Sequence, residues 1–175
     1  SKDGTILAVG DPKTQSVERD APGWSDTMFS GRVRVYTINN GSLSQLGSTI
    51  IAPDISGTYT MFGYALDVCK TPDGIYLTVG APGWGSNRGI INAYRYDNNN
   101  WVRIDTGLNS SVLPPTDSYV GRSISTIKDT DEKLYIAYTI EGLNQVYVKT
   151  YLPGFFWTNN SGGNATIAIE GGEKT

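Results

Sequence analysis

The 175-residue chain repeats itself, and this repetition constrains its fold more than any other feature of the sequence. The run DGTILAVGDP at residues 3–12 returns as DGIYLTVGAP at residues 73–82, and a degenerate copy, DEKLYIAY, occupies residues 131–138. Self-similarity of this kind is typical of folds that stack one supersecondary unit several times. The sequence therefore predicts a single domain, residues 1–175, built from three repeats at approximately residues 1–61, 62–119 and 120–175.

Further anchors set the spacing of the repeats. Three pairs of matching residues lie 58 positions apart, namely Gly31 and Gly89, Gly63 and Gly121, and Gly74 and Glu132. Only Gly4 and Gly74 are farther apart, at 70 positions. The additional residues fall between Gly10 and Gly31, so we expect one long inserted loop at residues 11–30.

Each repeat has the pattern of short strands separated by turns. Apolar residues alternate or run briefly between Gly, Pro, Asn and Asp, and the chain holds 21 Gly and 8 Pro, too many turn formers for long helices. In the second repeat the pattern predicts strands at residues 62–68, 75–80, 89–96 and 101–104. A repeated four-stranded antiparallel unit is typical of the blades of a β-propeller.

We therefore predict an all-β chain, a β-propeller of four-stranded antiparallel blades with about three blades. Closed propellers have about four to eight blades. The three blades would accordingly form part of a larger ring, an open arc, or half of a ring assembled from two chains.

Composition excludes several classes of function. The chain has no His and one Cys, so zinc sites of the usual kind, Ser-His or Cys-His nucleophiles and internal disulfides are not expected. With 14 Lys and Arg against 17 Asp and Glu and no basic run, the chain is not expected to bind nucleic acid. No apolar run approaches the roughly 20 residues that span a bilayer, so membrane insertion is not expected either. We expect no cofactor and no enzymatic activity.

The second repeat also shows a family resemblance. Phe62-Gly63, the later Gly80-Ala81-Pro82 and the Gly-x-x-x-x-Tyr element at residues 89–94 resemble the FG-GAP repeats of the integrin α-chain propeller and its relatives. The first repeat has Asp11 in place of the Ala, and the third has Tyr138-Thr139-Ile140 in place of Gly-Ala-Pro. The resemblance implies an extracellular, cell-surface or virion-surface protein that serves adhesion or ligand binding rather than catalysis.

The chain departs from this family at the calcium loop. Integrin-type repeats often carry Asp-x-Asp-x-Asp-Gly there, because calcium needs several oxygen ligands in one turn. Residues 69–74, CKTPDG, hold one carboxylate and a lysine, so we expect no calcium at this turn. The weak metal candidates are instead Asp129, Asp131 and Glu132, for which a solvated acidic turn is the alternative.

The candidate ligand-binding residues lie in loops expected at one end of the blades. Two Ala-Pro-Gly-Trp runs place Trp24 and Trp84 in equivalent loops, and Tyr59 and Tyr119 precede the first strands of the second and third repeats. Such aromatic rings can bind a protein or glycan partner. The alternative is that each Trp fills the gap between neighbouring blades.

Other features leave several hypotheses open. Glu18 and Asp20 in the inserted loop belong to the candidate rim and would serve a carboxylate-based glycosidase, although a solvated loop is the simpler interpretation. Sequons make Asn40, Asn109, Asn159 and Asn164 possible glycosylation sites. We expect a non-catalytic interaction or structural module, with a lectin as alternative. Its partners would be a protein or glycan, together with neighbouring blades of a larger propeller or a second copy of the chain.

Overall fold

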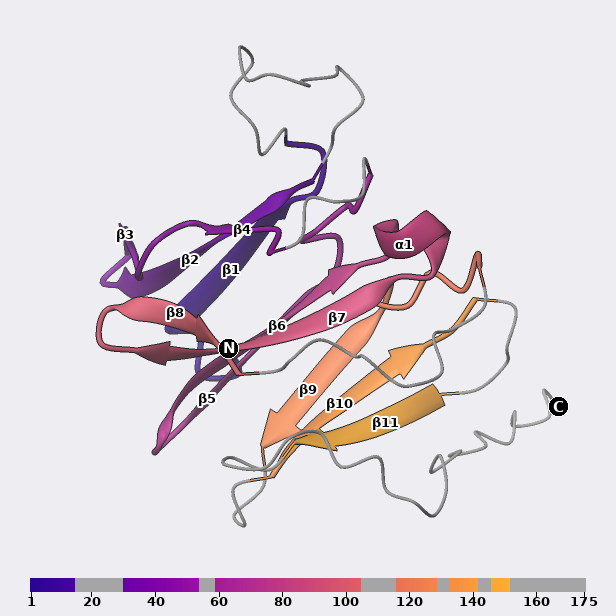
Figure 1. The fold of residues 1–175 in the computed structure, drawn as a ribbon. Helices are drawn as coiled ribbons and strands as arrows, with labels where there is room; N and C mark the ends of the chain where they lie inside the picture. The colour runs from indigo at the N-terminus through magenta and orange to yellow at the C-terminus, as the bar shows by residue number, and fades with distance from the viewer. Residues whose placement is uncertain (15–29, 54–58, 105–115, 129–132, 142–145, 152–175) are drawn as a thin grey trace, which may run out of the picture.

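The structure is a computed structural model, and it describes residues 1–14, 30–53, 59–104, 116–128, 133–141 and 146–151. In this part of the chain the fold is all-β, with antiparallel sheets and one short helical turn, α1 (Trp84–Asn87) (Figure 1). The described strands form three sheets, which follow one another in chain order and do not close into a ring.

The first sheet contains β1 (Ile6–Asp11), β2 (Arg32–Asn39), β3 (Ser42–Gln45) and β4 (Ile50–Ile51). Strand β2 pairs with β1, and at different positions along its length it pairs with β3 and β4. Asn40 and Gly41 connect β2 to β3 with φ angles of 49° and 78°. Two consecutive positive φ angles are the geometry of a tight hairpin turn, which Asn-Gly favours.

The second sheet contains β5 (Leu66–Thr71), β6 (Gly74–Ala81), β7 (Ile90–Asp97) and β8 (Asn100–Arg103), paired in that order. The last three strands match the predicted ones to within one residue at each end, but the first occupies residues 66–71 instead of 62–68. The chain turns there instead, because the Tyr64 N–H donates to the Met61 carbonyl at 3.1 Å and Met61 has a φ of 54°.

The third sheet contains β9 (Ile124–Lys128), β10 (Leu134–Thr139) and β11 (Val146–Tyr151), with β10 in the middle. Its register corrects the spacing of the repeats. Leu66 and Ile124 are equivalent residues 58 positions apart, and their pairing partners, Val79 and Tyr138, lie 59 positions apart. Strand β10 is therefore offset from β6 by 59 positions, not by the 58 predicted from Gly74 and Glu132. The difference matters because a shift of one residue moves a side chain to the other face of a strand.

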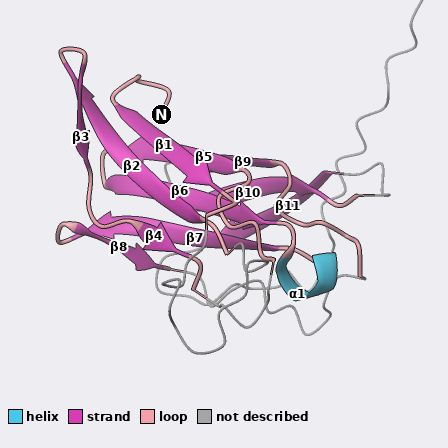
Figure 2. Ribbon diagram, turned by 90° about the horizontal axis from the view of Figure 1, so that it is seen from above, coloured by secondary structure: helices cyan, strands magenta, loops and turns pink. Residues whose placement is uncertain are grey.

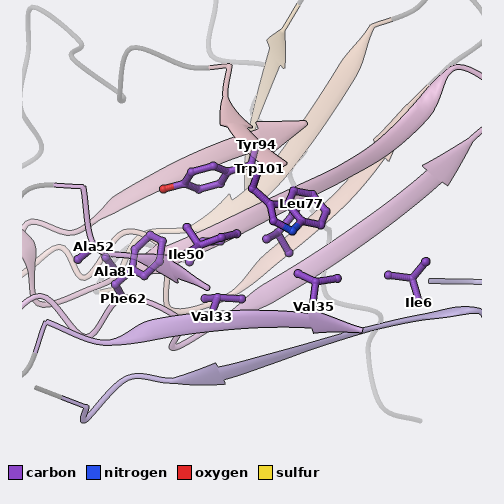
Figure 3. Close-up of a cluster of buried hydrophobic side chains, with 11 residues drawn as sticks. Ile6, Val33, Val35, Ile50, Ala52, Phe62, Leu77, Ala81, Tyr94 and Trp101 are labelled. Atoms are coloured by element: carbon purple, nitrogen blue, oxygen red, sulfur yellow. The ribbon is translucent and has the colours of Figure 1, made fainter. Parts of the chain in front are cut away.

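The core lies between consecutive sheets rather than within one pair of facing sheets. The first and second sheets enclose a cluster that includes Val33, Val35, Phe62 and Leu77, each at most 1% exposed (Figure 3). The second and third sheets enclose a smaller cluster, with Tyr76, Ile91 and Ala93 against Leu134 and Ile136. The second sheet is therefore covered on both faces.

The two junctions between sheets are built from equivalent residues. Gly31 forms an isolated parallel bridge with Phe62, and Gly89 forms the same kind of bridge with Val120. Gly89 and Val120 each lie 58 positions after their counterparts in the first bridge. Strands β1, β5 and β9 lie beside one another along one side of the molecule (Figure 2). Successive repeats therefore pack in the same way.

Candidate functional site

The described residues of the predicted rim lie together at one end of the sheets. Trp84 begins α1, directly after β6. The Gly83 N–H donates to the Thr60 carbonyl at 3.1 Å, and the Tyr119 N–H donates to the Asn87 carbonyl at 2.8 Å. The turn around α1 thus joins the segments that precede β5 and β9, and it brings Tyr59, Trp84 and Tyr119 to the same end.

These three aromatic side chains differ in their exposure. Trp84 is partly buried and packs against the cluster between the first and second sheets, which is the contact expected if it fills the gap between blades. Tyr119 is also partly buried, and the Arg122 guanidinium lies 5.2 Å from the centre of its ring. Tyr59 is the most open of the three, with 38% of its surface exposed.

Sequence reasoning missed a polar cluster beside Tyr119. Arg122 forms an ion pair with Glu141, and Tyr64, which is 47% exposed, hydrogen-bonds to Arg122. The Tyr64 hydrogen bond and the Glu141 carboxylate raise the pKa of the Arg122 guanidinium above its usual value. The available signal was that Tyr64 and Arg122 each follow a repeated glycine and lie 58 positions apart. We use the name loop rim for Tyr59, Tyr64, Trp84, Tyr119, Arg122 and Glu141.

A hollow of about 770 Å³ lies away from the loop rim, along β5, β9 and the residues that precede β1. Several of the charged groups that line it have partners. Lys70 Nζ donates to Asp3 Oδ2 at 2.9 Å, and Asp67 Oδ2 accepts the Thr126 N–H at 2.6 Å. Hydrogen bonds from Ser1, Lys70 and Thr5 hold the pKa of Asp3 well below its usual value. These contacts join the hollow's walls.

Beside the hollow, Asp73 links the second sheet to the third. Its carboxylate forms an ion pair with Lys128, whose side chain is only 2% exposed, and accepts a hydrogen bond from the Tyr76 hydroxyl at 2.8 Å. Burial acts to raise the pKa of Asp73, but hydrogen bonds from Lys128, Thr71 and Tyr76 outweigh it and hold that pKa well below its usual value. Asp73 is the only carboxylate in residues 69–74, and it is paired with the ammonium group of Lys128.

Of the remaining predicted site residues, the structure describes only Asn40. Asn40 is exposed at the β2–β3 turn. The others lie outside the described residues, namely Glu18, Asp20, Trp24, Asn109, Asp129, Asp131, Glu132, Asn159 and Asn164. Among the residues that the structure describes, no group of three His, Cys, Asp or Glu side chains could hold a metal ion. No helix in the described ranges is long and apolar enough to cross a membrane.

Comparison with known proteins does not assign the chain to a family. No protein-family model matches the chain, and no curated protein is significantly similar to it.

Proposed function

We propose that this chain is a non-catalytic interaction module of an extracellular, cell-surface or virion-surface protein, and that its loop rim binds a protein or glycan partner. Its three sheets would be blades of a β-propeller similar to the FG-GAP type. Rigid blades would hold the rim residues in place, while the loops between strands would provide specificity.

The propeller proposal is supported by the equivalence of the two junctions. Propellers repeat a sheet around an axis, so each blade packs against the next through the same positions. The bridges from Gly31 to Phe62 and from Gly89 to Val120 meet this requirement. The order of β5, β6, β7 and β8 in the second sheet is also the order expected of one complete blade.

The observation that carries the binding proposal is the gathering of aromatic rings and one arginine at a single end. Tyr59 and Tyr64 are 38% and 47% exposed, and the Arg122 side chain is 48% exposed. Tyrosine combines a broad apolar ring with a polar hydroxyl, and arginine offers several donors, so both types are favoured where proteins bind partners. Exposed tyrosine rings also suit the apolar faces of sugars, which keeps a lectin as the alternative.

Binding should be tested with a glycan array and with an array of purified cell-surface ectodomains. We expect the chain to bind on one of the two arrays, and Tyr59→Ala or Arg122→Ala to weaken that binding by about tenfold or more. Signal on the glycan array would favour the lectin, and signal on the ectodomain array a protein partner.

Val102→Ala is the matched control, because Val102 is 47% exposed but lies on β8, outside the loop rim. Binding that survives both rim substitutions, or binding to neither array, would contradict the proposal. Hydrolysis of a glycoside by the purified chain would contradict its non-catalytic part.

A further inference from the structure

The turn that precedes β9 has the same backbone hydrogen bond as the turn that precedes β5. Before β5, the Tyr64 N–H donates to the Met61 carbonyl at 3.1 Å. Before β9, the Arg122 N–H donates to the Tyr119 carbonyl at 3.2 Å. Met61 and Tyr119 also share a positive φ angle, 54° and 46°, which is uncommon for residues other than glycine. The fold thus builds this turn twice, although the side chains on it differ.

The segment that follows the middle strand of each repeat returns to this turn in the same way. The Gly83 N–H donates to the Thr60 carbonyl at 3.1 Å, and the Glu141 N–H donates to the Ser118 carbonyl at 2.9 Å. Glu141 therefore takes the place of Gly83, where a Cβ would lie 1.9 Å from the Tyr59 carbonyl oxygen. Because Gly83 makes its hydrogen bond without a side chain, this backbone contact does not require the carboxylate of Glu141.

The side chains that distinguish the third repeat form one cluster with Tyr64. Arg122 forms an ion pair with Glu141, hydrogen-bonds to Tyr64 and lies 5.2 Å from the centre of the Tyr119 ring. The Arg122 and Glu141 side chains are each 48% exposed, and Tyr64 is 47% exposed. Polar side chains held together on loops of a rigid scaffold are where binding sites commonly lie. We call these four residues the Arg122–Glu141 site.

The paired charges of this site favour a neutral ligand. An acidic ligand that approached the Arg122 guanidinium would meet the Glu141 carboxylate beside it, and a basic ligand at Glu141 would meet the guanidinium. A hydroxyl group is suited to both, because it can donate to the carboxylate or accept from the guanidinium. Hydrogen bonds of this kind are stronger than those between neutral groups.

The exposed Tyr64 ring adds an apolar surface beside the two charges. A sugar ring presents hydroxyl groups on adjacent carbons together with an apolar C–H face, whereas a protein presents its hydroxyl groups singly, on separate Ser, Thr and Tyr side chains. An aromatic ring next to a paired donor and acceptor therefore matches a sugar better than a protein surface.

We propose that the Arg122–Glu141 site binds a neutral sugar residue of a glycan. Its hydroxyl groups would donate to Glu141 and accept from Arg122, and its C–H face would lie on the Tyr64 ring. The inference rests on the proposed function, because the site is part of the loop rim, and it names which of the two partner classes the rim binds.

The experiment is a glycan array on which each neutral oligosaccharide is printed beside its sialylated or sulfated derivative. Isothermal titration calorimetry with the best-bound pair then gives the two affinities. We expect the 175-residue chain to bind the neutral member more tightly. Glu141→Gln keeps the size of the side chain but leaves Arg122 without its carboxylate, so we expect neutral binding to weaken by about tenfold or more and the preference to shift toward the acidic member.

Asp3→Asn is the matched control for this change of charge. Asp3 also pairs with a partly exposed cation, Lys70, and the two side chains are 44% and 41% exposed. This pair lies beside the hollow and outside the loop rim, so the substitution should leave both affinities unchanged. Circular dichroism would confirm that each variant folds.

Three results would overturn the inference and leave the proposed function standing. The first is tighter binding of the acidic member by the unmodified chain. The second is a Glu141→Gln variant that loses affinity for both members equally, because Glu141 would then only support the local structure. The third is binding on the ectodomain array with no signal on the glycan array. Binding on neither array would instead overturn the proposed function, and this inference with it.

Discussion

At the scale of single residues, the backbones of neighbouring sheets approach so closely at the junctions that some positions accept only glycine. Gly10 and Gly80 have no unusual φ angle, so what requires glycine at these positions is space alone. The carbonyl oxygens that a Cβ would meet belong to the backbone, which cannot move aside as a flexible side chain can. The same glycine in two repeats is thus explained by a contact that spans two sheets.

Gly80→Ala should therefore cause a large loss of stability. A Cβ at 1.9 Å from the Gly121 oxygen would force the second and third sheets apart, and we expect a loss of about 2–4 kcal/mol in the free energy of unfolding, measured by urea denaturation. Gly41→Ala is the control. Its Cβ would meet nothing within 4 Å, and its cost of about 1 kcal/mol would come only from the φ of 78°. Equal losses for the two variants would show that the close approach is unimportant.

At the scale of strands and turns, the contact between Asp73 and Lys128 ties the β5–β6 turn to the end of β9. Because hydrogen bonds hold the folded-state pKa of Asp73 below the ordinary value of 3.8, its ionised form stabilises the fold above that pH. This contribution is lost as the pH falls below about 4 toward the lower folded-state pKa. The raised pKa of Lys128 acts at the other extreme, since its contribution is lost only as the pH rises above 10.5.

Asp73→Asn should therefore lower stability at pH 7 and flatten its fall in acid. We expect a loss of about 1–2 kcal/mol at neutral pH, an estimate that allows for solvent screening of a carboxylate that is 37% exposed. Thermal or urea unfolding at several pH values between about 2 and 7 would measure both effects. Asp97→Asn, at the exposed end of β7, is the matched control and should change neither. A variant with unchanged neutral stability would argue against the link.

Sequence patterns could predict the strands because alternation and turn residues are local signals. The order of the four strands in the second sheet follows from them, and so does the two-residue turn at Asn40 and Gly41. They could not predict the offset of 59 in the third repeat, because Glu132 resembles no turn residue and only pairing with β9 reveals the register. The helical turn at Trp84 depends on contacts with neighbouring segments, so no local pattern predicts it. The cluster around Arg122 joins different repeats, and the only signal for it in the sequence is the 58-residue spacing of Tyr64 and Arg122.

At the scale of the whole molecule, the sheets differ in how completely they are enclosed. Strand β6 pairs with a neighbour on each edge, and both faces of its sheet are covered. Strand β1 has the same sequence pattern but pairs only with β2 among the described residues. Stability in repeat proteins is carried by contacts between neighbours, so the middle repeat should be the last part to open.

Amide hydrogen exchange tests this gradient at two equivalent residues. The Gly80 N–H donates to the Ala65 carbonyl, toward β5, and Thr78, two residues earlier on the same strand, directs its N–H the same way. Ala8 is the equivalent of Thr78, and the described residues hold no strand on that side of β1. We expect the Ala8 amide to exchange at least about 100 times faster than the Thr78 amide. Equal protection would mean that another strand pairs with the free edge of β1, and the first sheet would then be as fully enclosed as the second.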